Sequence, residues 1–207
     1  MSKSLQLFNK DFLAGILISL GGYANLTVGG IAGAVLFSFG LLGVIFLRCS
    51  LFTGMVGNMK GLAKSIIKEE PNEAGRIGFV IVILMLLILF GNVTGCLIFS
   101  LFTDIADKAA VVVTEHASRS AGRIICDAII CGLVVDLCVC IARERKSIIP
   151  VLIGVPLFIM VGGLHCIAEA YYILEAKHIT FSTIGYWLLV VFGNTIGCNV
   201  RAFFALK

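Results

Sequence analysis

The sequence predicts an all-α membrane protein in which six transmembrane helices form a single domain over residues 1–207. Three observations support this prediction: an apolar composition, six apolar runs of spanning length, and an internal repeat. Hydrophobic residues make up 59% of the chain and charged residues only 14%, whereas a soluble domain carries about 25% charged residues. These values argue against a soluble globular protein. The net charge is only +4 and the basic residues sit in short loops, so a nucleic-acid partner is not expected.

Six apolar runs account for the predicted helices, because a helix needs about 20 residues to cross the hydrocarbon core of a bilayer. The first run follows a charged start but no clean cleavage signal, so it is predicted to be a retained span rather than a signal peptide. Only a glycine-rich turn at Gly29 and Gly30 separates the first two runs. The runs cover residues 12–28, 31–47, 78–103, 121–141, 148–173 and 181–204.

The distribution of lysine and arginine predicts the orientation in the membrane. Cytoplasmic loops are enriched in these residues. With a cytoplasmic N-terminus, the inner loops carry 11 of them and the outer loops carry 4, while Arg48 lies within a span. Both termini are therefore predicted to be cytoplasmic. The inner residues are Lys3, Lys10, Lys60, Lys64, Lys68, Arg76, Arg143, Arg145, Lys146, Arg201 and Lys207, and the outer residues are Lys108, Arg119, Arg123 and Lys177.

All eight cysteines lie in apolar runs, where a thiol is usually a small buried apolar group. Cys138 and Cys140 are two residues apart, which does not match the spacing of a CxxC redox or zinc pair. No disulfide framework is therefore predicted. The others are Cys49, Cys96, Cys126, Cys131, Cys166 and Cys198.

An internal repeat links the third and sixth runs. Residues 91–96 read GNVTGC and residues 193–198 read GNTIGC, so the pattern GNxxGC recurs 102 residues later. Chance, or the close helix packing that glycines permit, is the alternative explanation. Three spans separate the two copies, and an odd number of spans reverses the orientation. The sequence therefore predicts two inverted repeats, at about residues 12–103 and 121–204, an architecture typical of channels and transporters whose midplane site is built from broken helices.

The second and fifth runs are predicted to contain the broken helices. In the second run the apolar residues lead into Arg48, Ser50 and Thr53, and in the fifth a glycine pair precedes His165 and Glu169. Irregular backbone at membrane depth is tolerated only where it is buried in protein or lines a cavity. Ionisable residues within spans indicate a functional site by default.

These segments resemble the formate/nitrite transporter family over about residues 12–204. The sequence LFTG at 51–54 is similar to the family's loop that breaks helix two. The sequence VPLF at 155–158, followed by GLH at 163–165 and by Ala168, is similar to its broken helix five, and the two GNxxG segments match helices three and six. The resemblance implies an aquaporin-like six-helix protomer, a homopentamer in the bilayer of a bacterial inner membrane, and one pore per protomer. Such pores pass small monovalent weak-acid anions: formate, nitrite, hydrosulfide or lactate-like monocarboxylates.

The same resemblance assigns site residues. Thr53 and His165 would form the central polar pair of the pore. Two apolar constrictions would lie on either side, formed by Phe37, Leu41, Leu51, Phe52, Phe158 and Ala168. The chain departs from the family pattern at Ser50, Met55, His116, Gly132 and Glu169.

A proton-linked mechanism follows from the cost of dehydrating an anion, which amounts to several kcal/mol in a dry interior. A neutral weak acid avoids most of this cost. We therefore expect His165 to orient and polarise the substrate and to link its passage to protons, because imidazole exchanges protons near neutral pH. The hydroxyl of Thr53 would donate a hydrogen bond to the substrate or to His165. The alternatives are that His165 is a structural hydrogen-bonding residue, that Thr53 bonds to its own helix, and that the phenylalanines are core or lipid-facing.

Charged residues within the spans carry further hypotheses. Arg48 and Glu169 either face each other across the two halves as a charge pair, or Arg48 reaches the cytoplasmic surface while Glu169 lies in a water-filled vestibule. Asp127 and Asp136 are nine residues apart, on opposite faces of a helix, and so form no catalytic dyad. Asp136 is expected to pair with a neighbouring helix or protomer.

Other functional classes remain as alternatives. Glu169 favours a channel for a small neutral or cationic solute on the same scaffold. A membrane enzyme or redox protein is not expected, because the chain has no HExxH, CxxCH or nucleotide-binding motif. It has only 3 histidines, His116, His165 and His178, so no haem, di-metal site or other cofactor is predicted.

Overall fold

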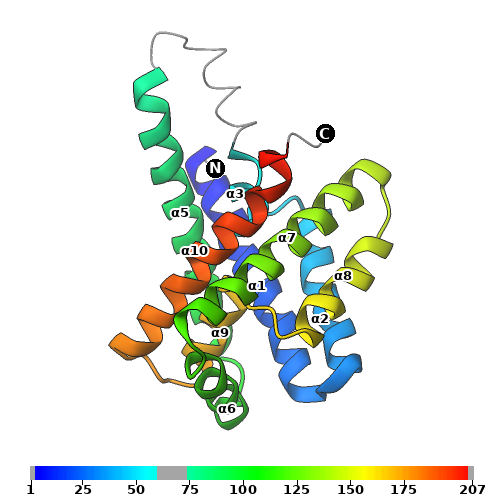
Figure 1. Cartoon of the computed structure of the whole chain (residues 1–207), viewed down its shortest axis with the longest axis vertical. Helices are drawn as coiled ribbons and strands as arrows, with labels where there is room; N and C mark the ends of the chain where they lie inside the picture. Colours follow the sequence, from blue (N-terminus) through cyan, green and yellow to red (C-terminus); the bar gives the residue numbers. More distant parts are fainter. Residues whose placement is uncertain (1–2, 60–73, 205–207) are drawn as a thin grey trace.

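The computed structural model describes residues 3–59 and 74–204, and the side chains of residues 8–59 and 77–204. Within these ranges the chain is helical, with short turns between the helices (Figure 1). The helices are α1 (Lys3–Val28), α2 (Gly30–Phe46), α3 (Phe52–Val56), α5 (Ala74–Ser100), α6 (Ala106–Ala117), α7 (Ala121–Arg145), α8 (Ile149–Met160), α9 (Cys166–Glu175) and α10 (Phe181–Phe203). Four of the inner basic residues used above for orientation, Lys60, Lys64, Lys68 and Lys207, lie outside the described residues.

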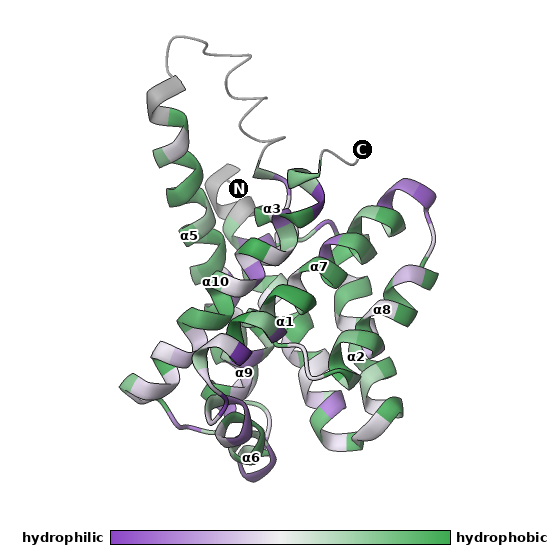
Figure 2. Ribbon diagram, viewed as in Figure 1, coloured by the Kyte–Doolittle hydropathy of each residue, from purple (hydrophilic) through white to green (hydrophobic). Residues whose placement is uncertain are grey.

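Four helices are long and apolar enough to cross a membrane, by length and composition alone: Phe8–Val28, Ile77–Ser100, Ala121–Arg145 and Phe181–Phe203. They match the first, third, fourth and sixth predicted runs. The helices α2 and α8 are apolar but shorter. Figure 2 shows that apolar residues dominate the long helices, α2 and α8, and that hydrophilic residues gather on α6 and around the turn after α7. Large apolar side chains such as Phe79, Phe90 and Ile153 are exposed, as lipid contact requires.

Both runs that were predicted to contain breaks are interrupted where polar residues and glycines begin. The helix α2 ends at Phe46, Arg48 takes a positive φ of 53°, and α3 starts at Phe52. The helix α8 ends at Met160, Gly162 takes a φ of 79°, and α9 starts at Cys166. A positive φ ends a helix locally, and glycine adopts it without a steric penalty.

A buried asparagine satisfies the backbone at the first break. Asn92 of α5 accepts a hydrogen bond from the backbone N–H of Phe52 at 2.9 Å. Its amide nitrogen donates to the carbonyl oxygens of Asp11 at 2.7 Å and Ser50 at 2.9 Å. Unpaired backbone groups at membrane depth are costly, so this one side chain fixes α3 against α1 and α5.

The second break has a matching asparagine. Asn194 of α10 accepts from the backbone N–H of Cys166 at 2.8 Å. Its amide nitrogen donates to the carbonyl oxygens of Ala128 and Leu164, both at 2.8 Å. Each asparagine of the GNxxGC pattern therefore makes the same three contacts, one to a long helix and two across a break.

The glycines of the same pattern allow close helix packing. A Cβ on Gly95 would lie 2.2 Å from the carbonyl oxygen of Phe12, and a Cβ on Gly197 would lie 2.2 Å from that of Ile129. Both distances are far inside van der Waals contact. The pattern therefore joins α5 to α1 and α10 to α7 through close backbone contact, as small residues do between membrane helices.

The helix α6 was not predicted, because residues 104–120 fall between the third and fourth apolar runs. It carries only a narrow apolar stripe, with Ala109 and Val113 buried one turn apart. It packs against α9 and lies at the end of the molecule opposite the start of α1 and the end of α10 (Figure 1).

Candidate functional site

The two helix breaks bring Thr53 and His165 together in the interior. Thr53 lies in the first turn of α3 and is fully buried, and His165 caps the N-terminus of α9 and is 3% exposed. The hydroxyl oxygen of Thr53 lies 3.2 Å from Nε2 of His165. Although 112 residues separate them in the chain, the structure places them in direct contact, as the resemblance implied.

The hydrogen bonds of His165 indicate its tautomer. Its Nδ1 accepts from the backbone N–H of Ala168 at 3.4 Å, so the proton of the neutral ring lies on Nε2. Nε2 then donates to the oxygen of Thr53. This leaves the hydroxyl hydrogen of Thr53 free to donate to another group. Among the described residues, no hydrogen bond joins that hydroxyl to its own helix.

A cavity of about 140 Å³ lies on the α6 side of the pair, and we call it the large cavity. The ring of Phe158 lies between those of Phe37 and His165, with centroid separations of 6.1 Å and 6.3 Å. A cavity of this size has room for water molecules. The remaining lining residues are Asn25, Leu26, Val112, His116, Ile159, Gly162, Gly163, Ala168, Glu169 and Tyr172.

A much smaller cavity, of about 10 Å³, lies among α2, α3 and α7, and we call it the small cavity. Its lining residues include Leu41, Leu51, Gly54 and Arg143. Its volume is at the lower limit for a single water molecule. Phe52 lines neither cavity; its side chain is in the core and its backbone is held by Asn92. The structure therefore places Phe37, Phe158 and Ala168 at one cavity and Leu41 and Leu51 at the other.

Glu169 points into a polar cluster at the large cavity. It is 2% exposed and accepts a hydrogen bond from the hydroxyl of Tyr186 at 2.7 Å. Its other oxygen lies 3.1 Å from Nδ1 of His116 on α6. Burial alone would lower the pKa of His116, but the charge and hydrogen bond of Glu169 outweigh it, so the pKa of His116 is raised above 6.5. Tyr186 lies in an ordinary apolar run, so no sequence pattern marked it as a site residue.

The structure does not bring Arg48 and Glu169 together, so the charge-pair hypothesis is corrected. Arg48 is exposed at the end of α2 and makes no described contact with Glu169. Both oxygens of Glu169 already have partners in Tyr186 and His116, so the carboxylate does not need an arginine to offset its burial. The alternative, a surface arginine and a glutamate at a cavity, agrees with the geometry.

Arginines hold both aspartates of α7. Asp127, which is 1% exposed, accepts from Arg119 at 3.0 Å and lies 2.9 Å from Arg123. Arg119 also donates to the carbonyl oxygen of Gly162 at 2.9 Å and so ties the second break to the start of α7. Asp136 pairs with Arg201 of α10 at 2.8 Å. The expectation that Asp136 pairs with a neighbouring helix is confirmed.

The cysteines are all described and all are free thiols. Six are buried, whereas Cys126 is exposed and Cys140 is partly exposed. Within the described residues, no group of three or more histidine, cysteine, aspartate or glutamate side chains lies close enough to hold a metal ion.

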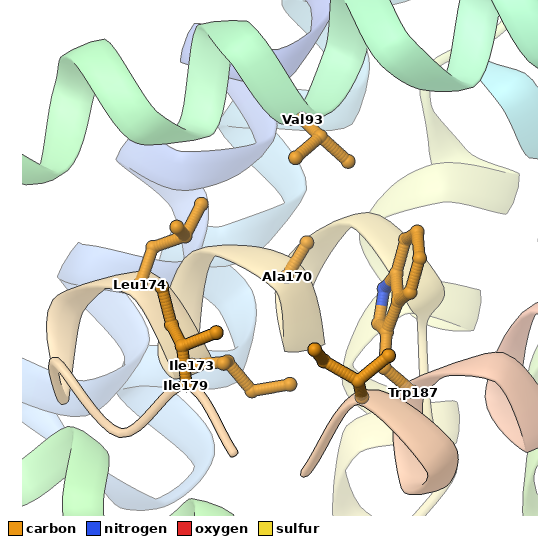
Figure 3. A pocket seen from close by; sticks show the side chains of 7 residues that line it. Val93, Ala170, Ile173, Leu174, Ile179 and Trp187 are labelled. Carbon is orange, nitrogen blue, oxygen red and sulfur yellow. The ribbon is translucent and has the colours of Figure 1, made fainter. Parts of the chain in front are cut away.

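A separate apolar hollow of about 110 Å³ lies between α5, α9 and α10 (Figure 3). The ring of Trp187 forms one wall and Val93 faces it from α5. The indole nitrogen of Trp187 donates to the carbonyl oxygen of Cys166 at 2.8 Å, which leaves only the apolar ring surface toward the hollow. The hollow contains none of the predicted site residues.

The fold and site define a helical membrane protein in which two interrupted helices meet at a buried threonine–histidine pair. The family model described as formate/nitrite transporter matches residues 2–206. The chain therefore belongs to the formate/nitrite transporter family, whose members are channels and transporters.

Solved structures agree with this assignment. A "Pentameric formate channel with formate bound" superposes with a TM-score of 0.72 at 17% identity, over 98% of this chain and 95% of that one. An "FNT family ion channel" superposes with a TM-score of 0.81 at 19% identity, over 99% of this chain and 92% of that one. At these identities the likeness concerns the fold. No curated protein sequence matches the chain.

Proposed function

We propose that this chain is a membrane channel for small monovalent weak-acid anions (formate, nitrite or hydrosulfide), linked to protons through His165. One observation carries the proposal: in a chain of this family, a buried histidine that lines an aromatic-lined cavity contacts a buried threonine whose neighbours Leu51 and Gly54 line an aliphatic cavity. The family and the fold support anion transport as the general function.

The proposed mechanism uses the free hydroxyl hydrogen of Thr53. Because Nε2–H of His165 donates to the Thr53 oxygen, that hydroxyl is polarised and can donate to an anion arriving from the large cavity. The rings of Phe37 and Phe158 give the large cavity an apolar wall near this position. A bare anion would lose several kcal/mol on dehydration, so the substrate crosses the small cavity as the neutral acid, after protonation at or before His165.

The membrane architecture is part of the proposal. Six spans arise if α2 with α3, and α8 with α9, each cross the bilayer as one interrupted helix. The matched contacts of Asn92 and Asn194 support two repeats related by inversion. The positive-inside count supports cytoplasmic termini in an inner membrane. The pentameric structural neighbour supports a homopentamer of these protomers.

Flux measurements with purified protein in proteoliposomes test the function. Influx of formate, nitrite, hydrosulfide and lactate would be compared at pH 5.5 and 7.5 for wild type and His165→Phe. We expect selective flux of one of these anions, stronger at pH 5.5 and at least tenfold lower in the variant. His178→Phe is the matched control, because His178 is exposed in the turn after α9. Normal flux in folded His165→Phe would contradict the role of His165.

A second candidate function rests on Glu169. A buried carboxylate at the large cavity attracts a cation and repels an anion when its charge is not offset. Ammonium flux in the same proteoliposomes, with no flux of the four anions, would favour a channel for a small neutral or cationic solute. Glu169→Gln would then abolish ammonium flux.

A further inference from the structure

The charges around the large cavity balance only in one protonation state. Glu169 is the one carboxylate that lines the cavity among the described residues. The carboxylates of Glu115 and Asp127, on the adjoining elements, already pair with Arg119 and Arg123. Glu169 accepts from the neutral hydroxyl of Tyr186, so its charge has no arginine partner among the described contacts. A second proton on His116 is what neutralises it.

The contact with Glu169 also fixes which nitrogen of His116 can exchange a proton. Glu169 lies against Nδ1, so Nδ1 keeps its hydrogen in both the neutral and the charged ring. The ring of His116 therefore gains and loses its exchangeable proton at Nε2. The side chain of His116 is 17% exposed and also lines the large cavity, so it reaches both water and the interior.

We propose that His116 is a second proton-transfer residue, which protonates the substrate anion in the large cavity before the anion reaches His165. This inference rests on the proposed function. In the step, the N–H bond at Nε2 of the His116 imidazolium breaks, and an O–H or S–H bond forms on the anion. The neutral acid moves toward Thr53, and neutral His116 regains a proton from water at the α6 surface.

The arrangement suits this role for two reasons. An anion entering the large cavity meets a neutral Glu169–His116 pair only when the ring is protonated; otherwise it meets an uncompensated carboxylate and is repelled. In addition, the pKa of His116 is raised, so the charged ring persists toward neutral pH. The ionisable groups facing it are Glu169 and Tyr172 from α9, Tyr186 from α10, Glu115 and Arg119 beside it, and His165 across the cavity.

The shape of the pH profile tests the inference. Influx would be measured in vesicles of uniform orientation at fixed anion concentration, while the pH on the α6 side is varied from 5 to 8. If His116 is the donor, wild-type influx levels off once the ring is fully protonated. In His116→Gln, influx of formate or nitrite must follow the neutral acid already present in solution, so it falls about tenfold for each unit of rising pH over the whole range and is about tenfold below wild type at pH 7.

Two further variants separate this role from a structural one. Glu169→Gln keeps a hydrogen-bonding group but removes the charge, so the plateau should move to lower pH by about one unit. Ring resonances of isotope-labelled histidine should report the same downward shift for His116, assigned by its loss in His116→Gln. The control is His178→Gln, which should leave the profile unchanged because His178 is exposed in the turn beyond α9.

The outcomes are distinguishable. A His116→Gln protein that assembles normally and keeps the wild-type plateau would overturn the inference while leaving the proposed function intact. A His116 resonance that does not move in Glu169→Gln would overturn it as well. A wild type with no flux of any weak-acid anion would overturn the proposed function, and the inference with it.

Discussion

At the scale of single residues, the Thr53 hydroxyl has two separable functions in the proposed site. Its oxygen accepts from Nε2 of His165, and its hydrogen is free for the substrate. Thr53→Val keeps the shape of the side chain but removes both hydrogen bonds. We expect influx at pH 6 to fall at least tenfold, and the free energy of unfolding to fall by about 1–3 kcal/mol because Nε2–H is left buried and unpaired.

Thr53→Ser is the matched control, since it keeps the hydroxyl and loses only a methyl group. Its influx should stay within about threefold of wild type. In thermal melts Thr53→Ser should unfold at a higher temperature than Thr53→Val, because only the serine variant keeps the hydrogen bond to His165. Equal influx in the valine and serine variants would show that the hydroxyl does not contact the substrate.

At the scale of elements, the breaks depend on asparagine. Asn92→Leu leaves the Phe52 N–H and the carbonyls of Asp11 and Ser50 without their partner. Each unpaired buried group costs about 1–3 kcal/mol, so the midpoint of thermal unfolding in detergent should fall strongly. Thr94→Val, in the same helix, is the control, because Thr94 bonds only to the carbonyl of Phe90 in its own helix. Equal melting of the two variants would contradict this role of Asn92.

A second prediction at this scale concerns the close contact between α7 and α10. In Gly197→Ala the added Cβ meets the carbonyl oxygen of Ile129 at 2.2 Å, so the two helices must separate. We expect a loss of several degrees in thermal midpoint and a lower yield of assembled protein. Gly185→Ala, earlier in α10, adds a Cβ with no atom within 4 Å and should melt like wild type or slightly higher, because alanine favours the helix.

At the scale of the whole molecule, apolar composition predicted an all-helical membrane protein, and the helices of the structure agree with it. The inverted repeats that the GNxxGC pattern predicts stay a prediction. Runs of about 20 apolar residues leave few alternatives to membrane helices, and the polar and glycine residues at 48–54 and 162–169 located both breaks. The pairing of Thr53 with His165 followed from the family resemblance. Because 112 residues separate them, the sequence pattern alone does not predict that they are in contact.

Other features could not be predicted for physical reasons. The helix α6 lies between the third and fourth apolar runs and buries only a narrow stripe, so a prediction based on long apolar runs missed it. Its packing against α9 places His116 beside Glu169, and α10 contributes Tyr186. These two residues occupy the place that was hypothesised for Arg48. Phe52 was misplaced because Leu51, the N-cap of α3, has an extended backbone while Phe52 begins the helix, and Leu51 lines the small cavity.

The orientation of the whole molecule gives the last prediction. The C-terminus of α6 lies just before the first turn of α7, and Glu144 lies in the last turn of α7. The two positions are therefore at opposite ends of α7. Single cysteines at the exposed positions Ser118 and Glu144 would be placed in a background where Cys126 and Cys140 are changed to serine. With cytoplasmic termini, a membrane-impermeant maleimide should label Ser118→Cys in right-side-out vesicles and Glu144→Cys only in inverted ones. The reverse pattern would show that α6 and the large cavity face the cytoplasm, and proton donation by His116 would then act on anions leaving the cell rather than entering it.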